Sequence, residues 1–212
     1  MKTKADSFPT VTVIARNLSS EQLHLIAEQM VATGIRSMEV SLVGDHACED
    51  IRSLCNEFEG QLLIGAGTVL SLEDAKRSVD AGASFLLSPV QFGADVIDYA
   101  HECGVLAIPS GLTPTEIYKQ LSLGADIIKV FPAARMTPAY LKDLRAPLGD
   151  FPIMVVGGIN AQNIQSYLDA GARYAGLGTG CFRPEDLDAL DAAGIRQSLE
   201  MLVCYERAQS SL

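Results

Sequence analysis

Short apolar runs alternate with amphipathic segments along the whole chain at a nearly constant spacing. Seven glycines, 20 to 26 residues apart, each close a segment of helical period and stand just before an apolar run. They are Gly34, Gly60, Gly82, Gly104, Gly124, Gly149 and Gly171. Glycine at such a position commonly ends a helix. The runs themselves have the length and β-branched composition of buried strands.

With one more run at the front of the chain, the pattern predicts eight strands. They are Val11–Ile14, Ser37–Leu42, Leu62–Ile64, Ser84–Leu87, Val105–Ile108, Asp126–Val130, Ile153–Val156 and Tyr174–Leu177. Strands that alternate with helices at this period indicate a (β/α)₈ barrel rather than a solenoid. No linker or change of composition divides the sequence, so we predict a single domain over residues 1–212.

The segments between the runs carry helix-start signals. Ser19 and Gln22 form a capping-box pattern, and Thr113, Pro114 and Glu116 form another with proline at the first helical position. Asn160 is the predicted cap of the seventh helix. The tail, from Pro184 to about Ala208, predicts one longer closing helix.

Composition excludes several classes of function. The 212 residues are 48% hydrophobic and carry a net charge of −10 without a basic run, which argues against nucleic-acid binding. No window of about 18 apolar residues predicts a membrane span. No long apolar stretch follows the first residues as in a signal peptide. We therefore expect a cytoplasmic protein with no membrane partner.

Cysteine and histidine have no ligand spacing. The five cysteines are scattered without a C-x-x-C pair, and the three histidines fall on separate predicted helices. The sequence thus predicts a reduced protein that uses no metal and no cofactor.

Lys129 is the most unusual residue of the predicted barrel. It interrupts the apolar strand Asp126–Val130, where an ammonium group is costly to bury. Burial lowers the pKa of a lysine and turns it into an amine nucleophile for a ketone. The alternative is that Lys129 reaches water from the strand end or pairs with a carboxylate.

Further polar residues and glycines follow the other predicted strands. In this fold the chemistry collects at the carboxyl ends of the strands, where Arg16 and Glu39 both lie. Glu39 stands among apolar neighbours, so it is a candidate acid/base, or else it neutralises Arg16 or Lys129. Paired glycines after the seventh and eighth strands are candidates for a phosphate site built from backbone N–H groups, although tight turns also favour glycine. These glycine segments are Gly157-Gly158 and Gly178-Thr179-Gly180.

Taken together, these stretches resemble the class I aldolases that cleave 2-keto-3-deoxy-6-phosphogluconate (KDPG), and the sister enzymes for the 6-phosphogalactonate epimer. The matching stretches run in order over most of the chain. They are Met38–Val40, Gly65–Leu70, Leu87–Pro89, Thr113–Glu116, Ile128–Ala133, Val156–Ile159 and Gly176–Thr179.

The resemblance implies a homotrimeric (β/α)₈ barrel that uses no metal, and it implies a role for each matched residue. Lys129 would form the Schiff base and Glu39 would be the acid/base. Thr68 would hold the substrate carboxylate, and Pro89 would line its pocket. Independently of the resemblance, Arg16 is the fixed cation at the predicted strand ends whose fork matches this carboxylate, unless it pairs with Glu39 instead. The phosphate would lie on Gly157, Gly158, Gly178 and Thr179.

Several positions depart from the family pattern. The gluconate branch has an arginine where this chain has Val43, whereas the galactonate branch has one at the end of the first strand, where Arg16 stands. Ala134 replaces an acidic residue, and Ser110 replaces the usual glycine after Pro109.

The expected reaction is cleavage of KDPG to pyruvate and glyceraldehyde 3-phosphate, with the 6-phosphogalactonate epimer or 4-hydroxy-2-oxoglutarate as alternative substrates. Two other classes stay open from the residues alone. One is a phosphosugar isomerase or epimerase that uses Glu39 as base, and the other is a barrel that only binds a phosphorylated metabolite.

Overall fold

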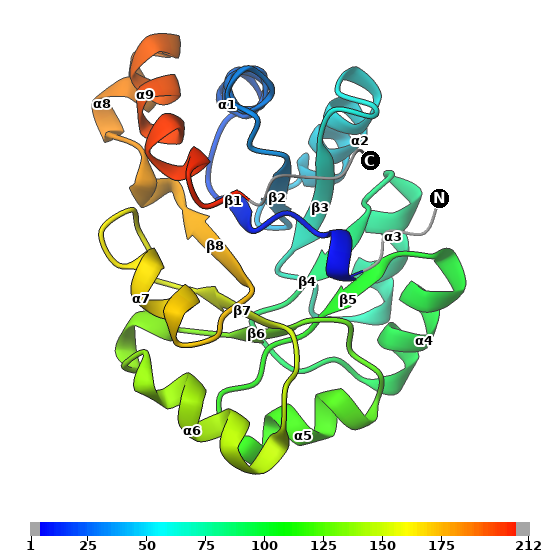
Figure 1. The fold of residues 1–212 in the computed structure, drawn as a ribbon. Helices are drawn as coiled ribbons and strands as arrows, with labels where there is room; N and C mark the ends of the chain where they lie inside the picture. Colours follow the sequence, from blue (N-terminus) through cyan, green and yellow to red (C-terminus); the bar gives the residue numbers. More distant parts are fainter. Residues whose placement is uncertain (1–4, 207–212) are drawn as a thin grey trace.

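The computed structural model describes residues 5–206. In this range eight parallel strands form one sheet, with helices around its outer face (Figure 1). The strands are β1 (Val11–Ala15), β2 (Ser37–Ser41), β3 (Leu63–Gly67), β4 (Phe85–Leu87), β5 (Leu106–Ile108), β6 (Ile128–Val130), β7 (Ile153–Val156) and β8 (Tyr174–Gly178). The predicted (β/α)₈ barrel is confirmed.

Nine α-helices and three short 3₁₀ helices lie within residues 5–206. The α-helices are α1 (Ser20–Thr33), α2 (Ala47–Glu57), α3 (Leu72–Asp80), α4 (Ala94–Cys103), α5 (Pro114–Ser122), α6 (Ala139–Leu148), α7 (Ile164–Asp169), α8 (Pro184–Asp188) and α9 (Ala192–Val203). The 3₁₀ helices are η1 (Ala5–Ser7), η2 (Ala133–Arg135) and η3 (Thr179–Cys181). Both predicted capping boxes are present, at Ser19 and Thr113. In the described chain no helix is long and apolar enough to cross a membrane.

The barrel closes between β5 and β6. The strand order β5-β4-β3-β2-β1-β8-β7-β6 places these two strands at the ends of the sheet, and the bridge Ser110↔Lys129 joins them. The N–H of Lys129 donates to the carbonyl of Pro109 at 2.9 Å, and the N–H of Gly111 donates to the carbonyl of Lys129 at 3.0 Å. The closing hydrogen bonds therefore run through the predicted Schiff-base lysine.

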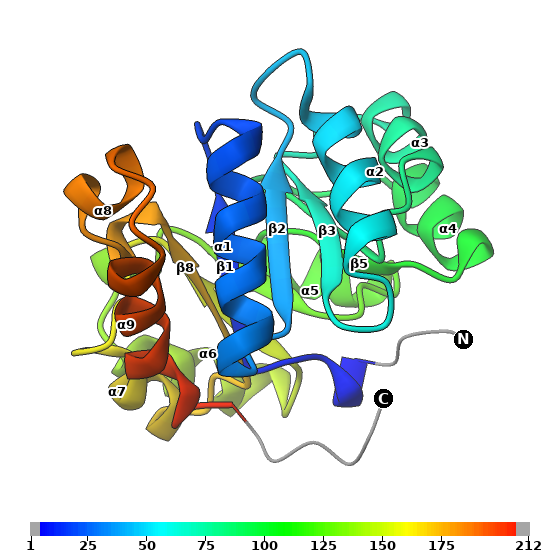
Figure 2. The same cartoon turned by 90° about the horizontal axis from the view of Figure 1, so that it is seen from above.

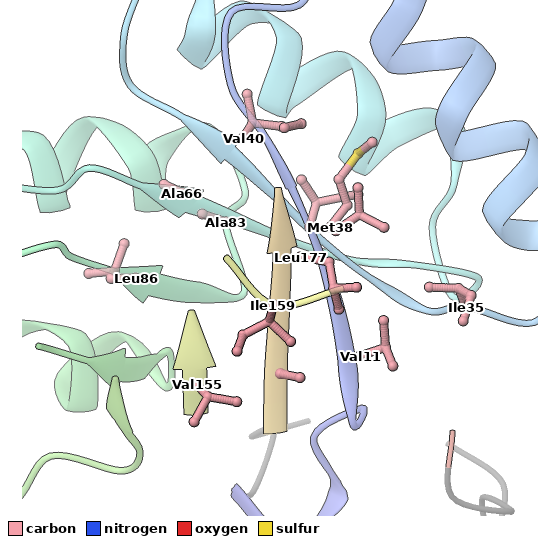
Figure 3. Packing of buried hydrophobic residues seen from close by; sticks show 14 of the residues in the cluster. Val11, Ile35, Met38, Val40, Ala66, Ala83, Leu86, Val155, Ile159 and Leu177 are labelled. Atoms are coloured by element: carbon pink, nitrogen blue, oxygen red, sulfur yellow. The ribbon is translucent and has the colours of Figure 1, made fainter. Parts of the chain in front are cut away.

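Alternate residues of each strand face opposite sides of the sheet. One set packs between the strands and the surrounding helices, and includes Met38, Val40, Val155 and Leu177 (Figure 3). A second apolar cluster fills the barrel interior. Its members from the strands are Ile14, Phe85, Leu87, Leu106, Ile108, Met154, Val156 and Tyr174.

An aromatic plug closes the amino-terminal end of the barrel. Phe8 lies edge-on to Phe85 and Tyr174, with ring centroids 5.1 and 5.6 Å away. Near the same end, the carboxylate of Glu206 accepts hydrogen bonds from the N–H groups of Thr10 and Val11. Glu206 follows α9, which lies beside α1 (Figure 2). The two ends of the described chain are thus joined below the barrel.

Three local predictions were wrong. The third strand does not end at Ile64: β3 continues through Gly65 and Gly67, and the ring of Phe85 and the carboxylate of Glu39 occupy the space that side chains at these two positions would need. Asn160 does not cap α7: its Oδ1 accepts from the N–H groups of Gln162 and Asn163 in a turn, and the helix begins at Ile164.

The third wrong prediction is the single closing helix. The chain breaks at Leu190, whose φ of 53° is left-handed, and this separates α8 from α9. The Asp191 side chain then accepts from the N–H of Ala193 and caps α9. Ala208 lies outside the described residues.

Candidate active site

Lys129 lies in the middle of β6 and is 3% exposed. Its carbonyl oxygen accepts from the hydroxyl of Ser110 at 3.1 Å as well as from the N–H of Gly111. Its Nζ lies 5.0 Å from the centroid of the Phe131 ring, within range of a cation–π contact. The lysine backbone is therefore fixed, and its amine does not reach open water, contrary to the alternative in which Lys129 extends to solvent.

Glu39 lies in the middle of β2 and is 1% exposed. The hydroxyl of Ser41 donates to its two carboxylate oxygens, at 3.1 and 3.2 Å. On the neighbouring strand, a Cβ atom at Gly67 would lie 1.0 Å from Oε1 of Glu39. The carboxylate therefore occupies a notch that exists only because residue 67 has no side chain.

Burial shifts the pKa of both groups toward their neutral forms. It raises the pKa of Glu39 to about 7, against the opposing effects of the Lys129 charge, the Ser41 hydrogen bond and the Arg16 charge. It lowers the pKa of Lys129 to about 8, opposed by the charge of Glu39 and assisted by that of Arg16. Near neutral pH the barrel thus holds a partly neutral amine and a partly ionised carboxylate, which are the forms of a nucleophile and a base.

Arg16 and Thr68 meet at the carboxyl ends of β1 and β3. Nη2 of Arg16 donates to Oγ1 of Thr68 at 3.3 Å. Within residues 5–206 no ion pair of 4.0 Å or less joins Arg16 or Lys129 to Glu39, so the site is not a simple neutralised pair. Thr68 has a φ of 58°, an unfavourable conformation for a β-branched residue, and such strain clusters at functional sites. Pro89 follows β4 at the same end of the barrel.

The two predicted phosphate segments also lie at this end. Gly157 and Gly158 follow β7 with φ of 94° and 76°, and a Cβ at Gly158 would lie 2.5 Å from that of Ala134. Gly178 ends β8 and Thr179 begins η3. β7 and β8 pair in the sheet as far as Val156 and Gly176, so the two glycine segments follow neighbouring strands.

Comparison with known proteins identifies the family. The aldolase family described as "KDPG and KHG aldolase" matches residues 2–198 of this chain. The chain belongs to this family. It is therefore an aldolase, a carbon–carbon lyase of the class that forms a Schiff base, as the sequence predicted.

Relatives of this aldolase include enzymes for both sugar-acid epimers. A probable 2-dehydro-3-deoxy-6-phosphogalactonate aldolase of Rhizobium meliloti (strain 1021) is 31% identical over 195 residues, which cover 91% of this chain and 90% of the relative. A 2-dehydro-3-deoxy-phosphogluconate aldolase of Treponema pallidum (strain Nichols) is 35% identical over 147 residues, covering 68% of each chain.

A solved structure of the KDPG aldolase from Legionella pneumophila holds pyruvate as a covalent carbinolamine intermediate. It superimposes on this aldolase with a TM-score of 0.82 and 27% sequence identity, over 94% of this chain and 98% of that one.

Two features of the site of this aldolase, Ser41 and the role of Gly67, were not predicted from its sequence. A usable signal was present, because Ser37, Glu39 and Ser41 alternate along one strand and must share a face. Gly67 carries no such signal: only the pairing register of β2 with β3, which includes Glu39↔Gly65 and Ser41↔Gly67, brings it beside the carboxylate.

Proposed function

We propose that the protein catalyses reversible retro-aldol cleavage of a 2-keto-3-deoxy-6-phospho sugar acid to pyruvate and glyceraldehyde 3-phosphate. The observation that carries the proposal is the pair of Lys129 and Glu39, buried inside one barrel with their pKa values moved toward each other. The covalent pyruvate adduct of the Legionella relative supports the same chemistry here.

In the proposed reaction the neutral amine of Lys129 attacks the C2 ketone to give a carbinolamine, whose hydroxyl takes a proton from the acid form of Glu39 and leaves as water, so that a protonated imine and an ionised Glu39 remain. Glu39 takes the proton of the C4 hydroxyl through a water molecule while the C3–C4 bond breaks. The electron pair of that bond moves to the imine and leaves an enamine, and the aldehyde departs. The enamine then takes a proton at C3 from Glu39, and water hydrolyses the imine to pyruvate and the free amine, with the released proton returning to Glu39.

The substrate carboxylate requires a cationic partner in a partly dry site. Arg16 offers a fixed charge, and its planar guanidinium group can donate two parallel hydrogen bonds to a carboxylate. Thr68, which already accepts a hydrogen bond from Arg16, adds a hydroxyl. We assign these two residues to the carboxylate and Pro89 to the wall of the same pocket.

We assign the substrate phosphate to Gly157, Gly158, Gly178 and Thr179. The turn conformations and the first N–H groups of η3 support this placement. Thr179→Ala should raise the KM for the phosphorylated substrate and leave that for its dephosphorylated analogue unchanged. Equal kcat/KM for the two substrates in the parent enzyme would contradict a phosphate site.

For the C4 epimer we propose 6-phosphogalactonate, in place of the KDPG that the sequence analysis put first. An arginine at position 16 with Val43 at the other position fits the galactonate branch, and the Rhizobium relative, matched over 91% of the chain, has that name. To test this choice, kcat/KM is measured for both epimers and for 4-hydroxy-2-oxoglutarate, with the release of pyruvate as the assay. A higher kcat/KM for KDPG would reverse it.

The central test is reduction with borohydride in the presence of pyruvate. We expect the mass of one pyruvyl group, mapped to the peptide that holds Lys129, and no label in Lys129→Met. Lys119→Met, which removes an exposed lysine of α5, is the matched control and should label normally. Label at another lysine, or none in the parent protein, would refute the assignment.

The single domain over residues 1–212, the homotrimer and the cytoplasmic location stay predictions. Light scattering after size-exclusion chromatography tests the trimer.

A further inference from the structure

The inner face of β2 carries three buried polar side chains, of Ser37, Glu39 and Ser41. Ser37 is satisfied by Thr12, whose hydroxyl donates to it at 3.0 Å. Ser41 is 6% exposed and donates to the two oxygens of Glu39. Within residues 5–206 this carboxylate has no other hydrogen bond. All the hydrogen bonding of this carboxylate in the described chain therefore comes from one hydroxyl.

The surroundings of Glu39 explain why that hydroxyl matters. On β3 the residue beside the carboxylate is Gly67, which has no side chain and therefore offers no side-chain hydrogen bond. The charged groups that act on it are Lys129 on β6 and Arg16 after β1. Neither lies within ion-pair distance in the described chain, so these cations change its charge but do not fix its position.

A serine hydroxyl suits a carboxyl group that gains and loses a proton. Its O–H donates to the ionised carboxylate, and after rotation its lone pairs accept from the protonated acid. A buried polar group without a partner costs about 1–3 kcal/mol, so a partner that serves both protonation states avoids that cost twice in each cycle.

We propose that Ser41 is a positioning residue for the aldol reaction, whose hydroxyl holds the Glu39 carboxyl in one orientation through both of its protonation states. This inference rests on the proposed function, in which Glu39 moves protons at the substrate. Ser41 itself touches no reacting atom.

The experiment measures exchange of the methyl protons of pyruvate for deuterium in D₂O, at saturating pyruvate. In this reaction the imine loses a C3 proton to Glu39, its C–H electron pair forms the enamine, and a deuteron returns to C3. Lys129 is held as the imine, and loss of the imine proton slows exchange on the alkaline side, so the acid limb of the exchange rate reports Glu39.

Ser41→Thr and Ser41→Val form a matched pair, because the two side chains have nearly the same shape and differ in the hydroxyl. We expect Ser41→Val to move the acid limb up by about one pH unit and to slow exchange about tenfold below it, because the ionised carboxylate loses a stronger, charge-assisted hydrogen bond than the protonated acid does. Ser41→Thr should keep the limb of the parent, and both should trap the imine with borohydride to the same extent.

The outcomes separate the two proposals. If the parent protein forms no imine with pyruvate, the proposed function fails. If it forms the imine and exchanges deuterium, but Ser41→Val keeps the rate and the acid limb of the Ser41→Thr variant, the role of Ser41 alone is wrong. Should Ser41→Val not fold, Ser41→Ala against Ser41→Thr gives the same comparison, with the same two readings.

Discussion

The two ends of the barrel share the same eight strands, but buried charged side chains line the interior at only one of them in the described chain. At the amino-terminal end Phe8, Phe85 and Tyr174 fill the interior, and the chain ends meet there. At the carboxyl end the polar side chains of Glu39, Ser41 and Lys129 and the small Gly67 stand beside apolar residues such as Leu87 and Ile108. Large apolar side chains bury surface and stabilise the fold, whereas small ones leave room for a substrate. The difference predicts that stability and catalysis respond to changes at opposite ends.

The largest effect should follow from a change at the plug. Phe8→Ala removes the ring that packs on Phe85 and Tyr174, and should lower the free energy of unfolding by about 3–5 kcal/mol. Urea denaturation measures it, with Phe8→Leu as the milder control. Because Phe8 lies far from the mouth along the strands, kcat/KM of the folded variant should stay within about twofold. A loss of kcat/KM as large, in free energy, as the loss of stability would contradict the separation of stability and catalysis between the two ends.

The reverse pattern is expected for Gly67→Ala. Its Cβ would lie 1.0 Å from Oε1 of Glu39, so the carboxylate must move. A misplacement of this size costs about 10²-fold in rate, or about 2.7 kcal/mol. Pyruvate deuterium exchange measures the loss. Gly44→Ala, where an added Cβ meets nothing within 4 Å, is the matched control. Unchanged exchange in Gly67→Ala would mean that the notch does not position Glu39.

The pH dependence of imine formation should sharpen the contrast further. The neutral amine is the nucleophile, and the lowered pKa of Lys129, about 8, means that its neutral fraction grows as the pH rises toward 8. Between pH 6 and pH 8 the rate at which pyruvate forms the imine should rise about fiftyfold. Stopped-flow quenching with borohydride measures this rate. A midpoint near the ordinary pKa of lysine would show that burial does not activate Lys129.

Arg16→Lys should have a moderate effect at the mouth. The substitution keeps the charge but loses the fork, so binding of pyruvate should weaken by about 1–3 kcal/mol. The pyruvate concentration that gives half-maximal trapping measures the change, and Arg52→Lys on the exposed face of α2 is the control. Normal affinity in a folded Arg16→Ala variant would require another partner for the carboxylate.

The smallest effect is expected from metal removal. In the part of the chain that is described, no three His, Cys, Asp or Glu side chains are grouped as metal ligands. Treatment with a chelator should therefore leave kcat/KM unchanged. Loss of activity that a divalent ion restores would contradict metal independence.

The sequence predicted the order of the elements and the reactive pair for physical reasons that act locally. A lysine or glutamate inside an apolar strand is conspicuous on its own, and glycines at helix ends mark the period of the barrel. The failures involve partners from other strands. Gly67 resembles a turn residue until the register of β2 and β3 places it beside Glu39, and Phe8 precedes the first strand with nothing local to assign it to the interior. Leu190 breaks the closing helix although leucine is a good helix former, and its left-handed conformation ends α8 with the N–H of Asp191 donating to the carbonyl of Asp186.

The closing bridge between β5 and β6 makes the integrity of the barrel inseparable from the position of its nucleophile. The N–H and the carbonyl of Lys129 both belong to that seam, and the hydroxyl of Ser110 adds a third bond to it. Any fluctuation that parts the two end strands must also displace the amine from the carboxylate on β2. Activity should therefore be lost when the barrel opens between β5 and β6, before the helices unfold. Substitutions that protect the activity of this chain against heat would then do so first by strengthening the few backbone hydrogen bonds at residue 129.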